Sequence, residues 1–207
     1  MTNIPLFPLP LVIFPGGKLP LQIYEARYVD MVKSCLRDGS GFGVIMITEG
    51  DQVLHDVEQQ LPSVSRCGTY CNITDFDELP NGMLGILAEG VKKFVICEEY
   101  EQPDRLMMGD VEFIADEIEV DIPDDKEHLS SLLESLMSHE VVQRLGIGCD
   151  LTQAVQVGAR LTELLPCSNR FKQRMLEIKD PLVRLSELEK IIDKIQKTQL
   201  GSNGIIK

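Results

Sequence analysis

The spacing of hydrophobic residues changes twice within the first 38 residues. Five of the eleven prolines lie between Ile4 and Pro20, and a helix cannot continue through them because proline lacks an N–H and clashes with the preceding turn. After a turn at 15–17, leucine and isoleucine alternate with other residues over 19–23, which predicts a half-buried strand. The apolar period then becomes helical, and one apolar face predicts a helix over 24–38.

Short apolar runs separated by turn residues fill the next part of the chain. They predict strands over 42–48, 64–76, 83–88, 91–100 and 106–115, with a weaker strand at 53–57. Pro80-Asn81-Gly82 has the composition of a hairpin turn, and Glu89-Gly90 predicts a second tight turn. Val91, Phe94 and Ile96 are the predicted core contacts of the strand that follows. Because the connections are too short for parallel crossovers, the pattern favours an antiparallel barrel or sandwich.

Beyond residue 120 the apolar residues recur at helical spacing. Stripes of this kind lie on 129–137, 151–165, 169–178 and 182–195. Asp150 with Gln153 resembles a capping box at the start of the second stripe, Ser168 is a candidate cap for the third, and Asp180-Pro181 predicts a sharp helix start. The chain therefore divides into three predicted segments, namely a β-barrel with one helix over 1–120, a helical bundle over 121–200 and a frayed tail over 201–207.

Charge and composition narrow the class of protein. The formal net charge is −13, and residues 98–127 hold thirteen Asp and Glu but only Arg105 and Lys126 as bases. An anionic protein repels the phosphate backbone, so nucleic-acid binding is disfavoured, and the acidic run is typical of a solvated strand edge and linker. The sequence shows neither a signal-peptide pattern nor an apolar run long enough to span a bilayer. We expect a cytoplasmic protein that does not engage a membrane.

The residues that carry chemistry give few positive signals. Cys67 and Cys71 share one face of a predicted strand, but structural zinc needs four ligands and no second pair exists, so core packing is the better interpretation. The acidic residues Asp75, Asp77 and Glu78 beside the predicted hairpin turn could bind a cation, although such residues are commoner in turns for backbone reasons. Common hydrolase, zinc-protease and nucleotide-binding motifs are missing from the sequence. We expect no catalytic residue, no metal and no cofactor.

Several motifs resemble the amino-terminal, substrate-binding domain of Lon proteases, above all the small bacterial proteins that consist of that domain alone. The matching residues are I-P-L-F-P-L at 4–9, L-P-L-Q-I-Y-E-A-R-Y at 19–28, C-G-T at 67–69, D-F-D-E-L-P-N-G at 75–82 and L-T-E-L-L-P at 161–166. The family usually has proline where Ala26 stands. The resemblance implies an α+β fold, in which a PUA-like antiparallel β pseudo-barrel precedes a helical bundle. It also implies the recognition of unfolded substrates. No ATPase or Ser-Lys protease motif is present, so proteolysis is not implied.

The leading hypothesis is therefore a non-catalytic module that binds unfolded or extended polypeptide segments, with a separate protease or chaperone as a further candidate partner and an oligomer as an open alternative. Phe7, Phe14, Tyr24 and Tyr28 are the candidate contact residues, since aromatic side chains dominate interface energies; large aromatics are, however, more often core residues. Two other hypotheses are an RNA-binding PUA-like protein and an enzyme of small molecules with Cys67 or Cys71 as its nucleophile.

Overall fold

The computed structural model describes residues 1–53 and 59–202, which form two compact units. The first unit comprises residues 1–116 and 167–177, and the second comprises 117–166 and 178 onward. The weak strand predicted at 53–57 lies outside the described residues from position 54. The tail predicted at 201–207 lies outside them from position 203.

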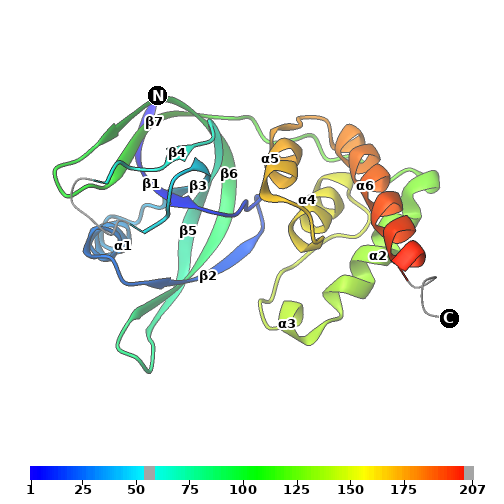
Figure 1. Cartoon of the computed structure of the whole chain (residues 1–207), viewed down its shortest axis with the longest axis horizontal. Coiled ribbons are helices and arrows are strands. Elements are labelled where there is room, and N and C mark those ends of the chain that lie inside the picture. The colour runs from blue at the N-terminus through cyan, green and yellow to red at the C-terminus, as the bar shows by residue number, and fades with distance from the viewer. Residues whose placement is uncertain (54–58, 203–207) are drawn as a thin grey trace. The chain divides into compact units, whose positions relative to one another are not determined.

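Seven strands make a single sheet in the first unit (Figure 1). They are β1 (Thr2–Leu9), β2 (Lys18–Ile23), β3 (Phe42–Glu49), β4 (Ser63–Val64), β5 (Cys67–Glu78), β6 (Leu84–Glu101) and β7 (Met107–Phe113). The order is β1-β7-β6-β5-β3-β4, and a further β1–β3 pairing closes five strands into a ring. All pairs are antiparallel except β1–β3. The prediction of a wholly antiparallel sheet is wrong at this pair, because β2 and a helix intervene and allow the chain to return in the same direction.

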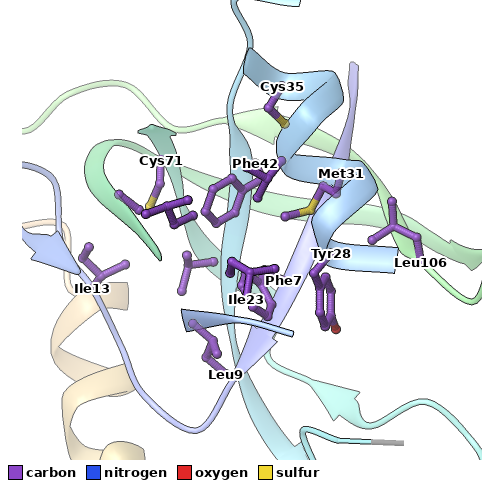
Figure 2. Close-up of a cluster of buried hydrophobic side chains, with 14 of the residues drawn as sticks. Phe7, Leu9, Ile13, Ile23, Tyr28, Met31, Cys35, Phe42, Cys71 and Leu106 are labelled. Atoms are coloured by element: carbon purple, nitrogen blue, oxygen red, sulfur yellow. The ribbon is translucent and has the colours of Figure 1, made fainter. Parts of the chain in front are cut away.

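The predicted strand–turn–helix corner forms the main core. Helix α1 (Ala26–Asp38) ends at Gly39, whose positive φ of 63° closes the last turn. Figure 2 shows Met31 and Tyr28 directed from α1 toward Phe7 and Phe42. The Phe7 ring centroid lies 4.1 Å from that of Tyr28 and 5.9 Å from that of Phe42. The predicted helix is therefore confirmed over 26–38, with its apolar face in the core, whereas Tyr24 precedes it and is 54% exposed.

The tight turn predicted at Glu89-Gly90 is wrong, because β6 runs through it without interruption. A Cβ atom on Gly90 would lie 2.3 Å from the carbonyl oxygen of Phe14, so glycine is needed here for a close backbone approach. The register with β5 shifts at this place, and Val91, predicted as a core residue, is 46% exposed. A bulge turns that side chain outward. Phe94 and Ile96 are buried as predicted.

Helix α5 (Asn169–Glu177) groups with the sheet of the first unit, although its stripe suggested a place in the bundle. The Nζ atom of Lys93 donates to the carbonyl of Leu176 at 3.0 Å, and Nε2 of Gln173 donates to the carbonyl of Cys67 at 2.9 Å. The predicted cap is confirmed, because the N–H of Phe171 donates to Oγ of Ser168 at 3.3 Å.

The second unit contains the 3-10 turn η1 (Asp124–Lys126) and four helices, α2 (Glu127–Met137), α3 (Glu140–Gln143), α4 (Ala154–Leu164) and α6 (Pro181–Ser202). The fully buried leucines of α2, α4 and α6 are Leu129, Leu133, Leu161, Leu185 and Leu188. Asp180 caps α6 as predicted, accepting from the N–H of Leu182 at 2.9 Å. The cap predicted at Asp150 is wrong, because the N–H of Ala154 donates to the carbonyl of Val120 at 2.8 Å and delays the helix start.

Candidate functional site

The candidate site is a groove of about 380 Å³ on the arm formed by β2, β5 and β6. Figure 1 shows the β5–β6 hairpin of this arm projecting past β2. The groove is lined mainly by apolar side chains, and its residues are Pro20, Leu21, Gln22, Asp75, Phe76, Asp77, Leu79, Gly85, Ile86 and Leu87. Neither lysine nor arginine is among them. A concave, mostly apolar surface with a few polar groups is typical of a binding site.

Strand pairing brings these distant residues together. β6 pairs with β2 on one side and with β5 on the other. Leu87 lies in register with Pro20 and with Asp75, and Gly85 lies in register with Gln22 and with Asp77. The neighbouring Ile86 is 4% exposed and belongs to the core. Because side chains alternate along a strand, Leu87 faces away from the core.

A glycine shapes the end of the groove. A Cβ atom on Gly85 would lie 2.9 Å from Cδ2 of Leu79, so the missing side chain makes room for Leu79. The predicted hairpin turn is confirmed next to it, since the N–H of Leu79 donates to the carbonyl of Met83 at 2.9 Å and Gly82 has a φ of 77°. The turn therefore places one more apolar side chain over the groove.

Both outer edges of the arm are poor templates for an added strand. Along an antiparallel strand, every second N–H group points toward the paired strand. Because the N–H of Leu79 donates to Met83, the N–H groups of Phe76 and Glu78 point away from β6. Each N–H donates instead to the carboxylate before it, at 2.9 Å to Oδ1 of Asp75 and at 2.8 Å to Oδ1 of Asp77. On the opposite edge, Pro20 has no N–H to offer. Contact through side chains is therefore favoured over strand addition.

The structure separates the four predicted contact aromatics. Phe7, Phe14 and Tyr28 are at most 3% exposed, so these rings fill the core and offer a partner no surface. Tyr24 is 54% exposed and follows directly after β2. Burial of Tyr28 raises the pKa of its hydroxyl, which stays neutral in the core.

Phe76 is a residue of the groove that sequence reasoning missed. The residue is 59% exposed and is one of those that line the groove. An aromatic flanked by aspartates, in the D-F-D-E run, was the available signal. The predicted strand ended at residue 76, but β5 continues to Glu78, and this extension makes Phe76 part of the arm.

The two cysteines considered as nucleophiles, Cys67 and Cys71, are both buried. Cys67 is 6% exposed and Cys71 is fully buried. Desolvation raises the pKa of the Cys67 thiol to about 11, so it stays protonated at neutral pH and is a poor nucleophile. Within residues 1–53 and 59–202, no three His, Cys, Asp or Glu side chains gather in a way that could hold a metal ion. Nor do those residues include a helix long and apolar enough to cross a bilayer.

Relatives of known class match nearly the whole chain. This chain is 24% identical over 203 residues to the Lon protease of Cytophaga hutchinsonii, and 24% identical over 200 residues to that of Bacillus thuringiensis. These alignments cover 92% and 93% of the chain but only 24% of each relative. The chain thus spans about a quarter of the length of the curated relatives it matches.

Solved structures agree with the fold. The crystal structure of a Lon N-terminal domain protein from Xanthomonas campestris is 30% identical, with a TM-score of 0.73, and the alignment covers 92% of this chain and 98% of that one. The N-terminal domain of a Mycobacterium avium complex Lon protease is 15% identical, with a TM-score of 0.58 and coverage of 90% and 96%, and it supports the fold alone.

The family comparison joins these observations. The model of the ATP-dependent protease La (LON) substrate-binding domain matches residues 3–194. That range includes the closed sheet, the arm with its groove and most of the second unit. The protein belongs to the Lon substrate-binding domain family.

Proposed function

We propose that the protein is a non-catalytic module that binds extended, apolar segments of unfolded polypeptides in the groove between β2, β5 and β6. The observation that carries this proposal is an apolar groove whose lining includes the exposed residue Phe76. A folded protein hides its apolar side chains, whereas an unfolded one presents them in extended segments that a groove of this kind can bury.

The energy available in the groove suits weak, reversible binding. Fully burying one large apolar side chain is worth about 1.5–3 kcal/mol, and association costs several kcal/mol in lost freedom. Two or three such contacts contribute about 3–9 kcal/mol before that cost, so the net affinity lies near the millimolar range, about −4 kcal/mol. Tyr24, two residues beyond Gln22 in the chain, extends the proposed contact surface.

Family membership supports the same function. Lon relatives are named for a protease, but the part of them that this chain matches is the substrate-binding domain. We place the protein in the cytoplasm, with polypeptide segments as its partners and a protease or chaperone as the destination of what it binds. We further assign the closed sheet to the PUA-like pseudo-barrels and the second unit to the helical bundles. The ring closure and the buried leucines of α2, α4 and α6 support both assignments.

Titration with a permanently unfolded protein tests the proposed function. Reduced, carboxamidomethylated α-lactalbumin carrying a fluorophore serves as the probe, and anisotropy reports binding. Phe76→Ser and Leu87→Ser should each weaken binding about tenfold, because each removes an apolar contact worth about 1.4 kcal/mol.

The matched control is Val183→Ser, which removes an apolar side chain that is 48% exposed on α6. We expect that variant to bind like the wild type, and the folded, disulfide-intact probe to bind none of the four proteins. Equal affinity of the wild type and all three variants for the unfolded probe would refute the proposal.

A further inference from the structure

The groove carries charge of one sign only. Its lining includes the carboxylates of Asp75 and Asp77 and no basic side chain. Both aspartates are exposed, as is Glu78 beside them. Aspartate is ionised at neutral pH, so one wall of the groove is negative.

Geometry leaves these carboxylates able to meet a ligand. Oδ1 of Asp75 accepts from the N–H of Phe76, and Oδ1 of Asp77 accepts from the N–H of Glu78. These bonds to the strand edge hold the two side chains in place and occupy one oxygen of each. The second oxygen, Oδ2, remains able to accept a further hydrogen bond.

The two aspartates lie beside the apolar floor. Asp75 is in register with Leu87, and Asp77 is in register with Gly85. An apolar side chain of a bound segment that covers Leu87 therefore brings its own neighbours to within reach of a carboxylate.

We propose that the groove selects extended segments in which lysine or arginine flanks the apolar residues, and that it disfavours segments with flanking aspartate or glutamate. This inference rests on the proposed function and names its substrate class. Charges around an apolar contact contribute mainly to the choice of partner, because like charges placed side by side are penalised.

Three labelled peptides test this selectivity. They have equal length and the same apolar centre, flanked by two lysines, two serines or two glutamates on each side. Anisotropy titrations should show the lysine peptide binding about tenfold more tightly than the glutamate peptide, with the serine peptide between them. Raising NaCl from about 0.05 M to about 0.5 M should remove most of the difference, since the Debye length falls below the separation of the charges.

Paired variants locate the source of the selectivity. Asp75→Asn/Asp77→Asn keeps the oxygens that accept from the strand edge but removes both charges, and it should reduce the lysine-to-glutamate ratio to about twofold or less. Glu98→Gln/Glu99→Gln removes the same total charge from exposed positions outside the groove and should leave the ratio unchanged.

The outcomes separate this inference from the proposed function. Equal affinity of the three peptides for the wild type, with Leu87→Ser still weakening all of them, would refute the charge selectivity alone. A preference that survives Asp75→Asn/Asp77→Asn, or that Glu98→Gln/Glu99→Gln removes equally, would also overturn it. Binding of none of the peptides would overturn both proposals.

Discussion

A buried ion pair in the second unit permits a quantitative test of what holds that unit together. The Arg184 side chain is fully buried and that of Glu117 is 8% exposed. Nη1 of Arg184 lies 2.8 Å from Oε2 of Glu117, and Nη2 donates to Oε1 of Glu117 and, at 2.6 Å, to the carbonyl of Ile178. The guanidinium of Arg184 thus joins its own helix to Glu117 and to Ile178.

Removing the guanidinium leaves a carboxylate buried without its main partner. Arg184→Met keeps much of the side-chain volume, so the loss is chiefly electrostatic. Breaking a buried pair from one side costs about 3–5 kcal/mol. For a unit of this size, 1 kcal/mol shifts the melting temperature by about 4–8 °C, so we expect the Tm of the second unit to fall by about 12 °C or more.

The distribution of aromatic residues provides the assay. All four tyrosines and all seven phenylalanines belong to the first unit, whereas α2, α3, α4 and α6 belong to the second. Thermal unfolding followed by circular dichroism at the helical band reports mainly the second unit, and the tyrosine band in the near ultraviolet reports the first. Arg184→Met should shift the helical transition far more than the tyrosine transition.

A double variant tests the reasoning behind the magnitude. Arg184→Met/Glu117→Leu replaces both charges with apolar groups, and replacing a buried pair in this way is often neutral or stabilising. We expect the double variant to be more stable than Arg184→Met alone. The account is contradicted if the destabilisations of Arg184→Met and Glu117→Leu simply add in the double variant. It is also contradicted if the free energy of unfolding of Arg184→Met lies within about 0.5 kcal/mol of the wild-type value.

Three further predictions concern single residues. The folded-state pKa of Cys67 is about 11 and an unfolded thiol titrates near about 8.5, so the thiol loses its proton first in the unfolded chain. The free energy of unfolding should therefore fall by about 2 kcal/mol as the pH rises from about 9 to about 11. Urea unfolding of Cys67→Ala should show a smaller decline over the same pH range. Gly90→Ala places a Cβ atom against the Phe14 carbonyl and should cost about 2–3 kcal/mol in urea unfolding, whereas Gly148→Ala, with open space around its Cβ position, should stay within about 0.5 kcal/mol. Asp180→Ala removes the cap of α6 and should lower the helical transition by about 1 kcal/mol, and an unchanged midpoint would mean that the cap contributes nothing.

Local chemistry in the sequence was enough to predict most individual elements. Helix α1, the turn at Pro80–Gly82 and the caps at Ser168 and Asp180 each depend on residues a few positions apart. The failures at Gly90 and Asp150 have one cause. At both places a backbone group from a distant segment, the carbonyl of Phe14 or of Val120, decides the local conformation.

The groove could not be predicted from the sequence either, because it too depends on contacts between distant segments. It depends on the pairing of β2 with the first half of β6, which joins residues more than sixty positions apart. Proline spacing and alternation identified β2, but neither indicates its partner strand. The candidate aromatics were chosen from the same corner of the chain, and the corner packs three of them inward. Sequence spacing does not single out Phe76, because the predicted strand ends at that residue.

Site-specific photo-crosslinking tests the central claim most directly. A benzophenone amino acid in place of Gln22, an exposed residue of the groove, is compared with the same group in place of Glu99, an exposed residue of β6 outside it. Reduced, carboxamidomethylated α-lactalbumin is the probe, and an excess of an unlabelled apolar peptide is the competitor. We predict a strong, competable crosslink from position 22 and little from position 99. Equal yields from both positions, or a crosslink from position 22 that the competitor leaves intact, would contradict the assignment of the groove as the polypeptide-binding site.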